Sequence, residues 1–275
     1  MSDDPVLDSI SADIASGNTA GLSAKLLSII ESSDDPYHIL KCMSMLKLVP
    51  QDGSESKACG RLLDVTKTED RLPVAKALLN LECPYFSYQM LEGSANTDQV
   101  CRVRYQSLYE LEEYESALEE YGNISSPVFN DRILLSKIQS SLGEHRASIE
   151  TAESLLKDAP NDYDVRIAYV NSLIMGGREK DAIKYSRDRL KDKSADSNAV
   201  IAYVLRIQGN VNAAGGYASR AVKLDNQHIG AMETLGICLA QKGEIDKARI
   251  VAGAINEISP GDRAAINVLS YCGQN

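Results

Sequence analysis

The feature that most constrains the fold of this chain is a repeated pattern of small residues, a turn glycine and a closing proline. In residues 229–262, Gly236 and Ala248 lie within two amphipathic stretches, Gly243 separates the stretches, and Pro260 follows the second. Small side chains at Gly236 and Ala248 allow two helices to approach closely, Gly243 suits a turn, and Pro260 ends a helix. The segment therefore predicts an antiparallel helical hairpin.

The same spacing continues upstream. Gly143, Gly177 and Gly209 stand where the turns of earlier hairpins would lie. The pattern predicts four further hairpins, in residues 98–128, 129–162, 163–194 and 195–228. Five consecutive copies are not expected by chance, and a fixed period of this length is typical of stacked helical repeats.

This pattern resembles the tetratricopeptide repeat, in which Leu-Gly, aromatic residues, alanines and a proline recur over about 34 residues. In the last hairpin, Leu235 opens the Leu-Gly pair and Ala248 holds an alanine position. Met232, Leu239 and Ala252 stand where the family usually has Trp, Tyr and Phe. The resemblance implies an all-α, right-handed superhelical solenoid of antiparallel helix hairpins.

Helix-start signals continue through residues 1–97, although the repeat pattern itself weakens there. Asp4 and Asp35 each precede a proline, which places a capping carboxylate before a proline in the first helical turn. Thr66, with Glu69 three residues later, predicts a capping box. We therefore expect three degenerate helical hairpins in this region.

A single helix is predicted for residues 263–275, after the last hairpin. A solenoid exposes an apolar face at its terminal repeat, and a lone helix is the usual cover. The sequence predicts that Ile266 and Leu269 are buried and that Asn267 and Ser270 face outward.

Composition narrows the class of partner. Of the 275 residues, 44% are hydrophobic but only 5% are aromatic and none is Trp, which favours helix packing over a sheet core. The net charge of −10 disfavours nucleic acid. The N-terminus lacks a secretion signal, and no apolar run approaches the roughly 20 residues that span a bilayer. We expect a cytoplasmic protein with no membrane partner.

The sequence offers no chemistry-bearing motif. The six cysteines are scattered without a Cys-x-x-Cys pair, which predicts reduced, mostly buried thiols. His38 and Cys42 are four residues apart, but no second pair completes a metal site. No glycine-rich phosphate loop is present. We therefore expect no catalytic residue, no cofactor and no metal, and the chain is not predicted to be an enzyme.

In the tetratricopeptide family the first helix of each hairpin lines a concave groove, so the resemblance implies that polar residues on this face contact a partner. In this chain those residues are Arg102, Gln106, Lys137, Asn171, Tyr203, Arg206 and Glu233. The alternative is that each is simply a solvated position of an amphipathic helix.

The predicted function is a protein-interaction scaffold that holds a peptide or helix of a partner protein, with groove cations favouring an acidic segment. Two alternatives stay open at this point, and so does the oligomeric state. One is a structural subunit that self-associates, or binds through its convex face or its N-terminal hairpins. The other is an RNA-binding helical repeat, which the net charge disfavours.

Two further features are best explained by ordinary helix structure and not by a binding site. Between residues 178 and 193, seven basic residues alternate with four acidic ones, which predicts an ion-paired, solvated helix. Gly215 and Gly216 fall within a predicted helix, where each glycine is unfavourable by about 1 kcal/mol relative to alanine. Close helix packing is the favoured explanation for this pair, and a partner helix on the convex face is the alternative.

Overall fold

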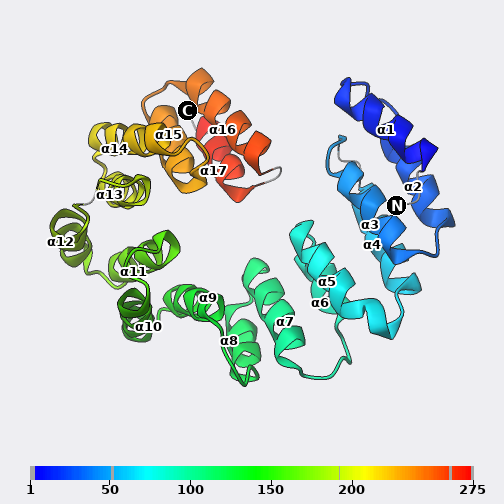
Figure 1. The fold of residues 1–275 in the computed structure, drawn as a ribbon, viewed down its shortest axis with the longest axis horizontal. Coiled ribbons are helices and arrows are strands. Elements are labelled where there is room, and N and C mark those ends of the chain that lie inside the picture. Colours follow the sequence, from blue (N-terminus) through cyan, green and yellow to red (C-terminus); the bar gives the residue numbers. More distant parts are fainter. Residues whose placement is uncertain (1–3, 51–52, 192, 260–261, 274–275) are drawn as a thin grey trace. The chain divides into compact units, whose positions relative to one another are not determined.

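A computed structural model describes residues 4–50, 53–191, 193–259 and 262–273, and these residues form helices joined by short turns (Figure 1). No strand occurs within these ranges. The prediction of an all-helical stack of hairpins is confirmed. Pro260, which was expected to end the last hairpin, lies outside the described residues.

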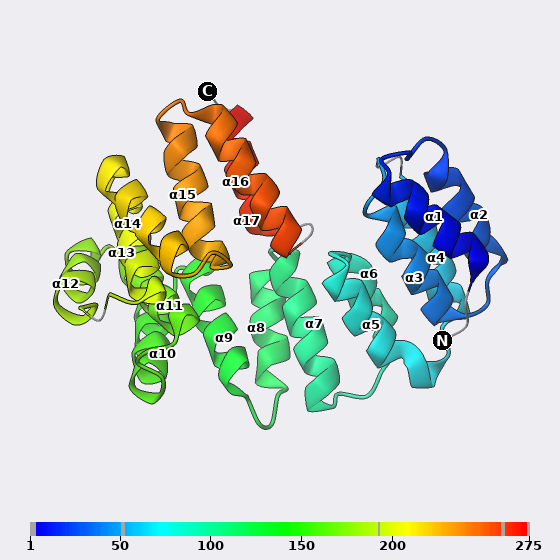
Figure 2. The same ribbon diagram turned by 45° about the horizontal axis from the view of Figure 1, so that its top comes forward.

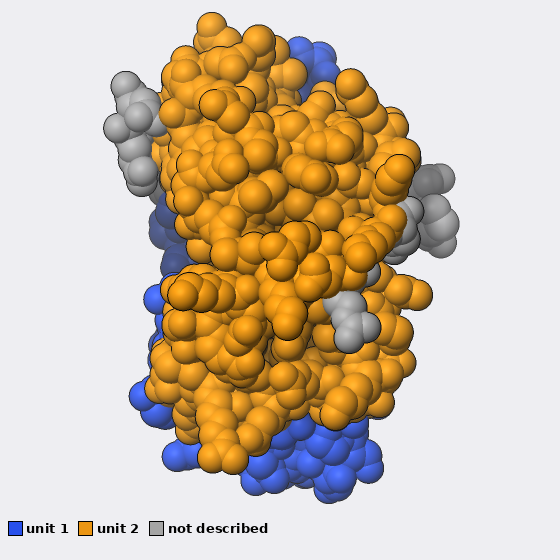
Figure 3. All heavy atoms as spheres, turned by 90° about the vertical axis from the view of Figure 1, so that its left-hand side faces the viewer, with its two compact units in different colours: residues 1–127 blue, residues 128–275 orange. Residues whose placement is uncertain are grey.

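The chain forms two compact units, residues 1–127 and residues 128–275, which are coloured separately in Figure 3. We describe each unit by itself and call them unit 1 and unit 2. The division predicted after residue 97 concerns the identity of the repeats, and it stays a prediction.

Unit 1 contains eight described α-helices and one 3₁₀ turn. They are α1 (Pro5–Ala15), α2 (Leu22–Ser32), α3 (Pro36–Leu46), α4 (Ser54–Val65), η1 (Thr68–Asp70), α5 (Arg71–Asn80), α6 (Pro84–Met90), α7 (Asp98–Glu110) and α8 (Tyr114–Gly122). Asp4 and Asp35 are N-caps, as predicted. The Asp4 carboxylate accepts from the Val6 amide at 3.0 Å, and the Asp35 carboxylate accepts from the Tyr37 amide at 3.0 Å.

The capping box predicted at Thr66 is wrong. The Thr66 hydroxyl donates to the carbonyl of Leu62 at 2.6 Å, so this residue closes α4 and opens no new helix. Helix α5 begins at Arg71, after the 3₁₀ turn. A threonine that follows a helix can bond back to the carbonyl four residues earlier, and this local bond competes with capping the next helix.

A continuous hydrophobic core runs through unit 1. Leu7, Leu26, Ile39, Leu62 and Leu78, one from each of five helices, are fully buried in it. Two valines of α7 join the same core. The core of the N-terminal helices therefore extends to α7, against which α5 and α6 pack.

Unit 2 contains nine described helices. They are α9 (Phe129–Ser141), α10 (His145–Asp158), α11 (Tyr163–Met175), α12 (Glu179–Arg189), α13 (Ala195–Ile207), α14 (Val211–Leu224), α15 (Ile229–Gln241), α16 (Ile245–Ile258) and α17 (Arg263–Gly273). Gly143, Gly177, Gly209 and Gly243 each follow an odd-numbered helix with φ between 71° and 78°. Because this left-handed backbone favours glycine, these residues form the predicted turns.

The helices of unit 2 form two rows, which can be followed in Figure 2. Each odd-numbered helix packs against the next odd-numbered helix, from α9 through to α17. The even-numbered helices α10, α12 and α14 each pack against the odd-numbered helices on either side. We call the odd-numbered helices the inner row and the even-numbered helices the outer row.

Helix α17 covers the end of the stack, but it does so with a different face from the one predicted. Val268 is fully buried, whereas Ile266 is 54% exposed and Leu269 is 43% exposed. A Cβ atom at Gly236 would lie 2.7 Å from both methyl carbons of Val268, so α15 and α17 meet at this glycine. Close approach requires the face of α17 that carries small residues such as Ala265, and this turns the larger side chains outward.

The expectations for the glycine pair and for the charged run hold in part. Gly215 is buried, with its Cβ position 3.6 Å from Cys238, whereas Gly216 is exposed and meets no other atom within 4 Å. Packing therefore explains only the first glycine. In α12, Arg178 pairs with Asp181 at 2.7 Å, as expected of an ion-paired helix. The lysines at 191 and 193 follow the end of that helix.

Candidate binding site on the inner helices

A tyrosine side chain connects two helices of the inner row of unit 2 near their N-terminal ends. Tyr163, at the start of α11, lies so close to Gly230 of α15 that a side chain at residue 230 would require the tyrosine ring to move. Its ring also meets the ring of His228 edge-on, with centroids 4.5 Å apart. Because Tyr163 belongs to α11 and Gly230 to α15, this contact joins two helices of the inner row that are second neighbours.

Three of the predicted site residues come together on this row. The Tyr203 hydroxyl of α13 donates to the Asn171 side-chain oxygen of α11 at 2.9 Å. The guanidinium carbon of Arg206 lies 5.5 Å from the centre of the Tyr203 ring, within the range of a cation–π interaction. We call Asn171, Tyr203 and Arg206 the inner site.

Arg206 is the most informative member of the inner site. Its Nε is buried and has no hydrogen-bond partner among the described residues. No carboxylate of the described chain lies within ion-pair distance of its guanidinium. A buried donor without a partner is unfavourable in a folded protein. The arrangement is therefore suited to accept an oxygen ligand from outside the chain.

The surroundings of the inner site keep its titratable groups neutral. Burial raises the pKa of Tyr203, and the nearby Arg206 charge only partly opposes this shift. Burial also raises the pKa of Cys238 on α15, again opposed by Arg206 and by Lys242. Both groups stay protonated at neutral pH, so neither is activated as a nucleophile or a general base.

Glu233 lies on the adjoining part of the inner row. Its carboxylate accepts from the Asn267 side chain of α17 at 2.7 Å. Its charge contributes to the raised pKa of both Tyr203 and Tyr163, which places it near the inner site. The cover helix α17 therefore orients one of the predicted site residues.

Lys137 is on α9 and is not brought into contact with the inner site. Its side chain is partly buried, and it forms no ion pair with a described residue. Helix α9 does pack against α11, which carries Asn171. Lys137 therefore belongs to the inner row without joining the cluster.

Arg102 and Gln106 belong to unit 1. They line a cavity of about 450 Å³ between α5 and α7, together with Lys76 and Gln99. Arg102 donates to the carbonyl of Ser126 at 2.6 Å and is therefore engaged within its own unit. The structure does not connect these two residues to the inner site.

Sequence reasoning missed two residues that shape the inner row. Tyr163 was not singled out, because a tyrosine at the first position of a helix gives no sign that it reaches a helix two hairpins away. Asn267 was predicted to face outward and it is exposed, yet it holds Glu233. Only the return of polar residues at the repeat spacing could have suggested this pair, since the two are 34 positions apart.

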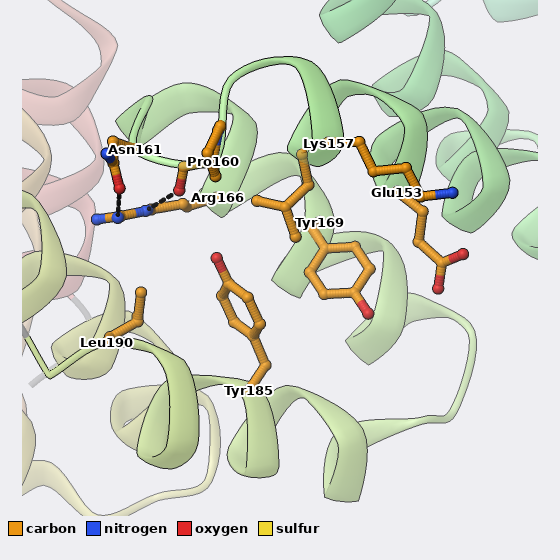
Figure 4. Close-up of a pocket in the computed structure, with 9 residues that line it drawn as sticks. Glu153, Lys157, Pro160, Asn161, Arg166, Tyr169, Tyr185 and Leu190 are labelled. Carbon is orange, nitrogen blue, oxygen red and sulfur yellow. Dashed lines mark hydrogen bonds between the residues drawn. The ribbon is translucent and has the colours of Figure 1, made fainter.

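A separate cavity of about 420 Å³ lies on the outer side of unit 2, where α10, α11 and α12 meet (Figure 4). The rings of Tyr169 and Tyr185 meet edge-on in it, with centroids 5.1 Å apart. Arg166 donates to the Pro160 carbonyl and to the Asn161 side chain, both at 2.8 Å. Because this arginine is buried and bonded within the chain, it supports the fold.

The described residues offer no metal site and no membrane span. No group of three or more His, Cys, Asp and Glu side chains among them could hold a metal ion. His38 instead places its Nε2 3.0 Å from the Asp4 carboxylate. All six cysteines are free and buried. None of the described helices combines the length and apolarity needed to cross a bilayer.

Comparison with known proteins identifies the fold. No protein-family model matches the sequence, and the search of curated proteins gave no match. A tetratricopeptide repeat protein from Parabacteroides merdae has a similar structure, with a TM-score of 0.51 and 13% identity, over 92% of this chain and all of that one. Yeast Tom70 gives a TM-score of 0.50 and 14% identity over 92% of this chain.

The match to Tom70 spans only 58% of that protein's structure. A tetratricopeptide repeat protein of Thermus thermophilus, TTC0263, is 17% identical, with a TM-score of 0.48 over 64% of this chain and 98% of that one. The likeness to the Parabacteroides merdae protein and to Tom70 shows that the chain has the tetratricopeptide repeat fold, as its sequence pattern predicted. At these identities the likeness concerns the fold alone.

Proposed function

We propose that the chain is a protein-interaction scaffold whose inner site binds a carboxylate of an extended segment from a partner protein. The proposal rests on the surroundings of Arg206. A partly buried guanidinium that stacks on Tyr203 and lacks a carboxylate among the described residues is suited to pair with one from a partner.

The neighbours of Arg206 support a peptide ligand. Asn171 keeps its side-chain amide group for a partner, because its oxygen already accepts from the Tyr203 hydroxyl. An amide donor beside a guanidinium suits a peptide that offers a carboxylate and a backbone carbonyl. Lys137 extends the positive character along the inner row. The bound segment would therefore be acidic.

Glu233 gives the proposed site a direction. Its carboxylate, held by Asn267, would repel an acidic group at the α15 end of the inner row. An acidic side chain would therefore bind toward α11 and α13, while a basic or polar residue of the partner faces α15. Arg102 and Gln106 in unit 1 form a second candidate contact surface in the same proposal.

The proposed role is binding and not catalysis. Burial raises the pKa of Tyr203 and of Cys238, beside Arg206, and holds both groups in their neutral, unreactive forms. A scaffold requires only that they provide shape and hydrogen bonds. Cytoplasmic location remains part of the proposal.

Selection from a displayed library of random peptides tests the proposed site on the full-length protein. We expect the selected peptides to be enriched in Asp and Glu and to bind Arg206→Met about tenfold or more weakly than wild type. Methionine keeps the apolar stem but removes the charge. Arg187→Met is the matched control, because Arg187 is exposed and pairs with its neighbour Asp188 on α12. If no selected peptide binds Arg206→Met more weakly than wild type, the assignment is refuted.

A further inference from the structure

The outer side of unit 2 has a second cavity, of about 580 Å³, between the end of α12 and helices α13 and α14. Its apolar lining residues are Leu190, Ile201, Tyr217 and Leu224. On α13, Ile201 lies about 160° around the helix axis from Tyr203. The cavity therefore faces away from the inner site, and we call it the outer pocket.

The outer pocket is lined by four cations. They are Lys191, Lys193, Arg220 and Lys223. No Asp or Glu is among the described residues that line it. The three lysines form no ion pair with any described carboxylate. In a chain with a net charge of −10, this is a local reversal of charge around an apolar cavity.

The carboxylates nearest in sequence are engaged elsewhere. Asp188 pairs with the Nε of Arg187 at 3.1 Å. Asp225 accepts from the backbone amide of Gln227 at 2.9 Å. Asp192 lies outside the described residues. The described acidic groups therefore leave the lysines of the outer pocket without a partner.

Lys193 has an unusual backbone conformation for a lysine. Its φ is 58°, in the left-handed region that Gly and Asn adopt more readily than other residues. The Asn198 side chain holds this turn by donating to the carbonyls of Lys193 at 3.1 Å and Ser194 at 2.7 Å. Glu82 and Glu112 adopt the same backbone region elsewhere in the chain, so the lining of the cavity, and not this φ, carries the argument for Lys193.

The cavity in Figure 4 occupies the equivalent place one hairpin earlier, and it lacks the cationic rim. Tyr185 lines that cavity. Tyr217, 32 residues later in the sequence, lines the outer pocket at the corresponding position. The lining of the earlier cavity includes both the acidic Glu153 and the basic Lys157, and Arg166 is bonded within the chain. The positive rim of the outer pocket is therefore not a general result of the repeat.

We propose that the outer pocket binds an acidic segment of a partner protein, with one apolar side chain of that segment inside the cavity and its carboxylates paired with Lys191, Lys193 and Lys223. The lining provides both parts of this interaction. Its apolar residues accept the apolar side chain of the partner, and its cations favour a segment that carries carboxylates. This site lies on the opposite side of α13 from the inner site, and the proposal does not depend on the function of that site.

A peptide fits the outer pocket better than a nucleic acid or a membrane. The guanidinium carbon of Arg220 lies 3.9 Å from the centre of the Tyr217 ring, so that face of the ring is covered and cannot stack on a base. The net negative charge of the whole chain would be repelled by a long polyanion or an anionic membrane surface. A short acidic segment meets only the local cations.

The test uses the full-length protein and a short fluorescein-labelled peptide of Glu and Ser residues with one central Leu. Binding is measured by fluorescence anisotropy. We expect saturable binding that weakens with added salt and is lost when Gln replaces every Glu, or Ser the central Leu. The triple variant Lys191→Gln/Lys193→Asn/Lys223→Gln should bind about tenfold or more weakly than wild type.

Lys193→Asn separates a binding role from a structural one. Asparagine tolerates the left-handed backbone, so this variant should be at least as stable to urea as wild type while it binds the peptide more weakly. The matched control is Lys157→Gln in the equivalent cavity, which should leave peptide affinity within about twofold of wild type. Arg206→Met disables the proposed inner site, and in that background the triple variant should still weaken peptide binding.

Three results would overturn the proposal. One is equal affinity of the triple variant and wild type for the peptide. Another is loss of peptide binding in Arg206→Met, which would place the peptide at the inner site. The third is absence of peptide binding together with lysine-dependent binding of phosphatidylserine vesicles or of poly-uridylate, which would assign the rim to a membrane or to RNA.

Discussion

Replacing Gly236 by alanine tests whether a single close contact seats the cover helix α17. A Cβ atom at residue 236 would lie 2.7 Å from both methyl carbons of Val268 and 3.3 Å from a methyl carbon of Val251. Carbon atoms in favourable contact are about 3.5–4.0 Å apart, so α17 would have to move away by roughly 1 Å.

The expected magnitude follows from two opposing effects. Overpacking of a core costs about 1–3 kcal/mol, whereas replacing a helical glycine by alanine contributes about 1 kcal/mol of stability. We therefore expect Gly236→Ala to lower the free energy of unfolding by up to about 2 kcal/mol. The loss should be concentrated in α17, because the largest clash is with that helix.

Urea denaturation followed by circular dichroism measures the total effect, and amide hydrogen exchange locates it. Val268→Ala removes the two methyl groups that clash, so the double variant Gly236→Ala/Val268→Ala should be more stable than the sum of the single effects predicts. The coupling should be about 1 kcal/mol. If the two substitutions are additive, or if exchange in α17 is unchanged in Gly236→Ala, the contact does not seat the helix.

Three further outcomes are expected. Gly216→Ala should stabilise the protein to urea by about 0.5–1 kcal/mol, because the glycine is helical and exposed and meets no other atom; a destabilised variant would contradict this. Arg166→Met should cost about 3 kcal/mol in the same assay, because it removes hydrogen bonds of a buried guanidinium, including that to Ser197 at 3.0 Å. Burial raises the pKa of Tyr163 above its ordinary value of 10.0, so its neutral form stabilises the fold and stability is lost as pH rises above about 10. Tyr163→Phe should reduce that alkaline loss in thermal melts, and an unchanged pH profile would refute the assignment.

The repeat architecture was predictable because its signals are local. A turn glycine acts through its own backbone, and each of Gly143, Gly177, Gly209 and Gly243 has the left-handed φ that a turn after a helix needs. Two N-caps of unit 1 were equally local, since an aspartate bonds to amides two or three residues away. Signals that act within one helical turn can be read from the chain itself.

The errors arose where several local solutions compete. Thr66 could either cap the following helix or bond back into α4, and the sequence does not show which. In α17, Ile266 and Leu269 are the larger apolar residues, but the glycine opposite leaves space only for a face of small side chains. The close approach of α15 determines this orientation. The sequence of α17 alone does not show how close α15 lies.

The candidate sites show the same division. The repeat spacing predicted that Asn171, Tyr203 and Arg206 share one face, and the structure brings them into contact. The repeat spacing could not show which of the predicted basic residues would lack a carboxylate as an ion-pair partner. It also gave no sign of the outer pocket, because Lys191 belongs to a run whose charges alternate along the sequence.

The contact of Tyr163 with α15 also bears on how unit 2 unfolds. In a stack where each hairpin touches only its neighbours, stability is a sum of nearest-neighbour interfaces, and the ends can fray one hairpin at a time. Tyr163 adds an interface between hairpins that are second neighbours, since its ring packs against Gly230 and His228. Opening α15 therefore also exposes the start of α11. The segment from α11 to α15 is expected to open as one cooperative block, so fraying from the C-terminus would stop at α16.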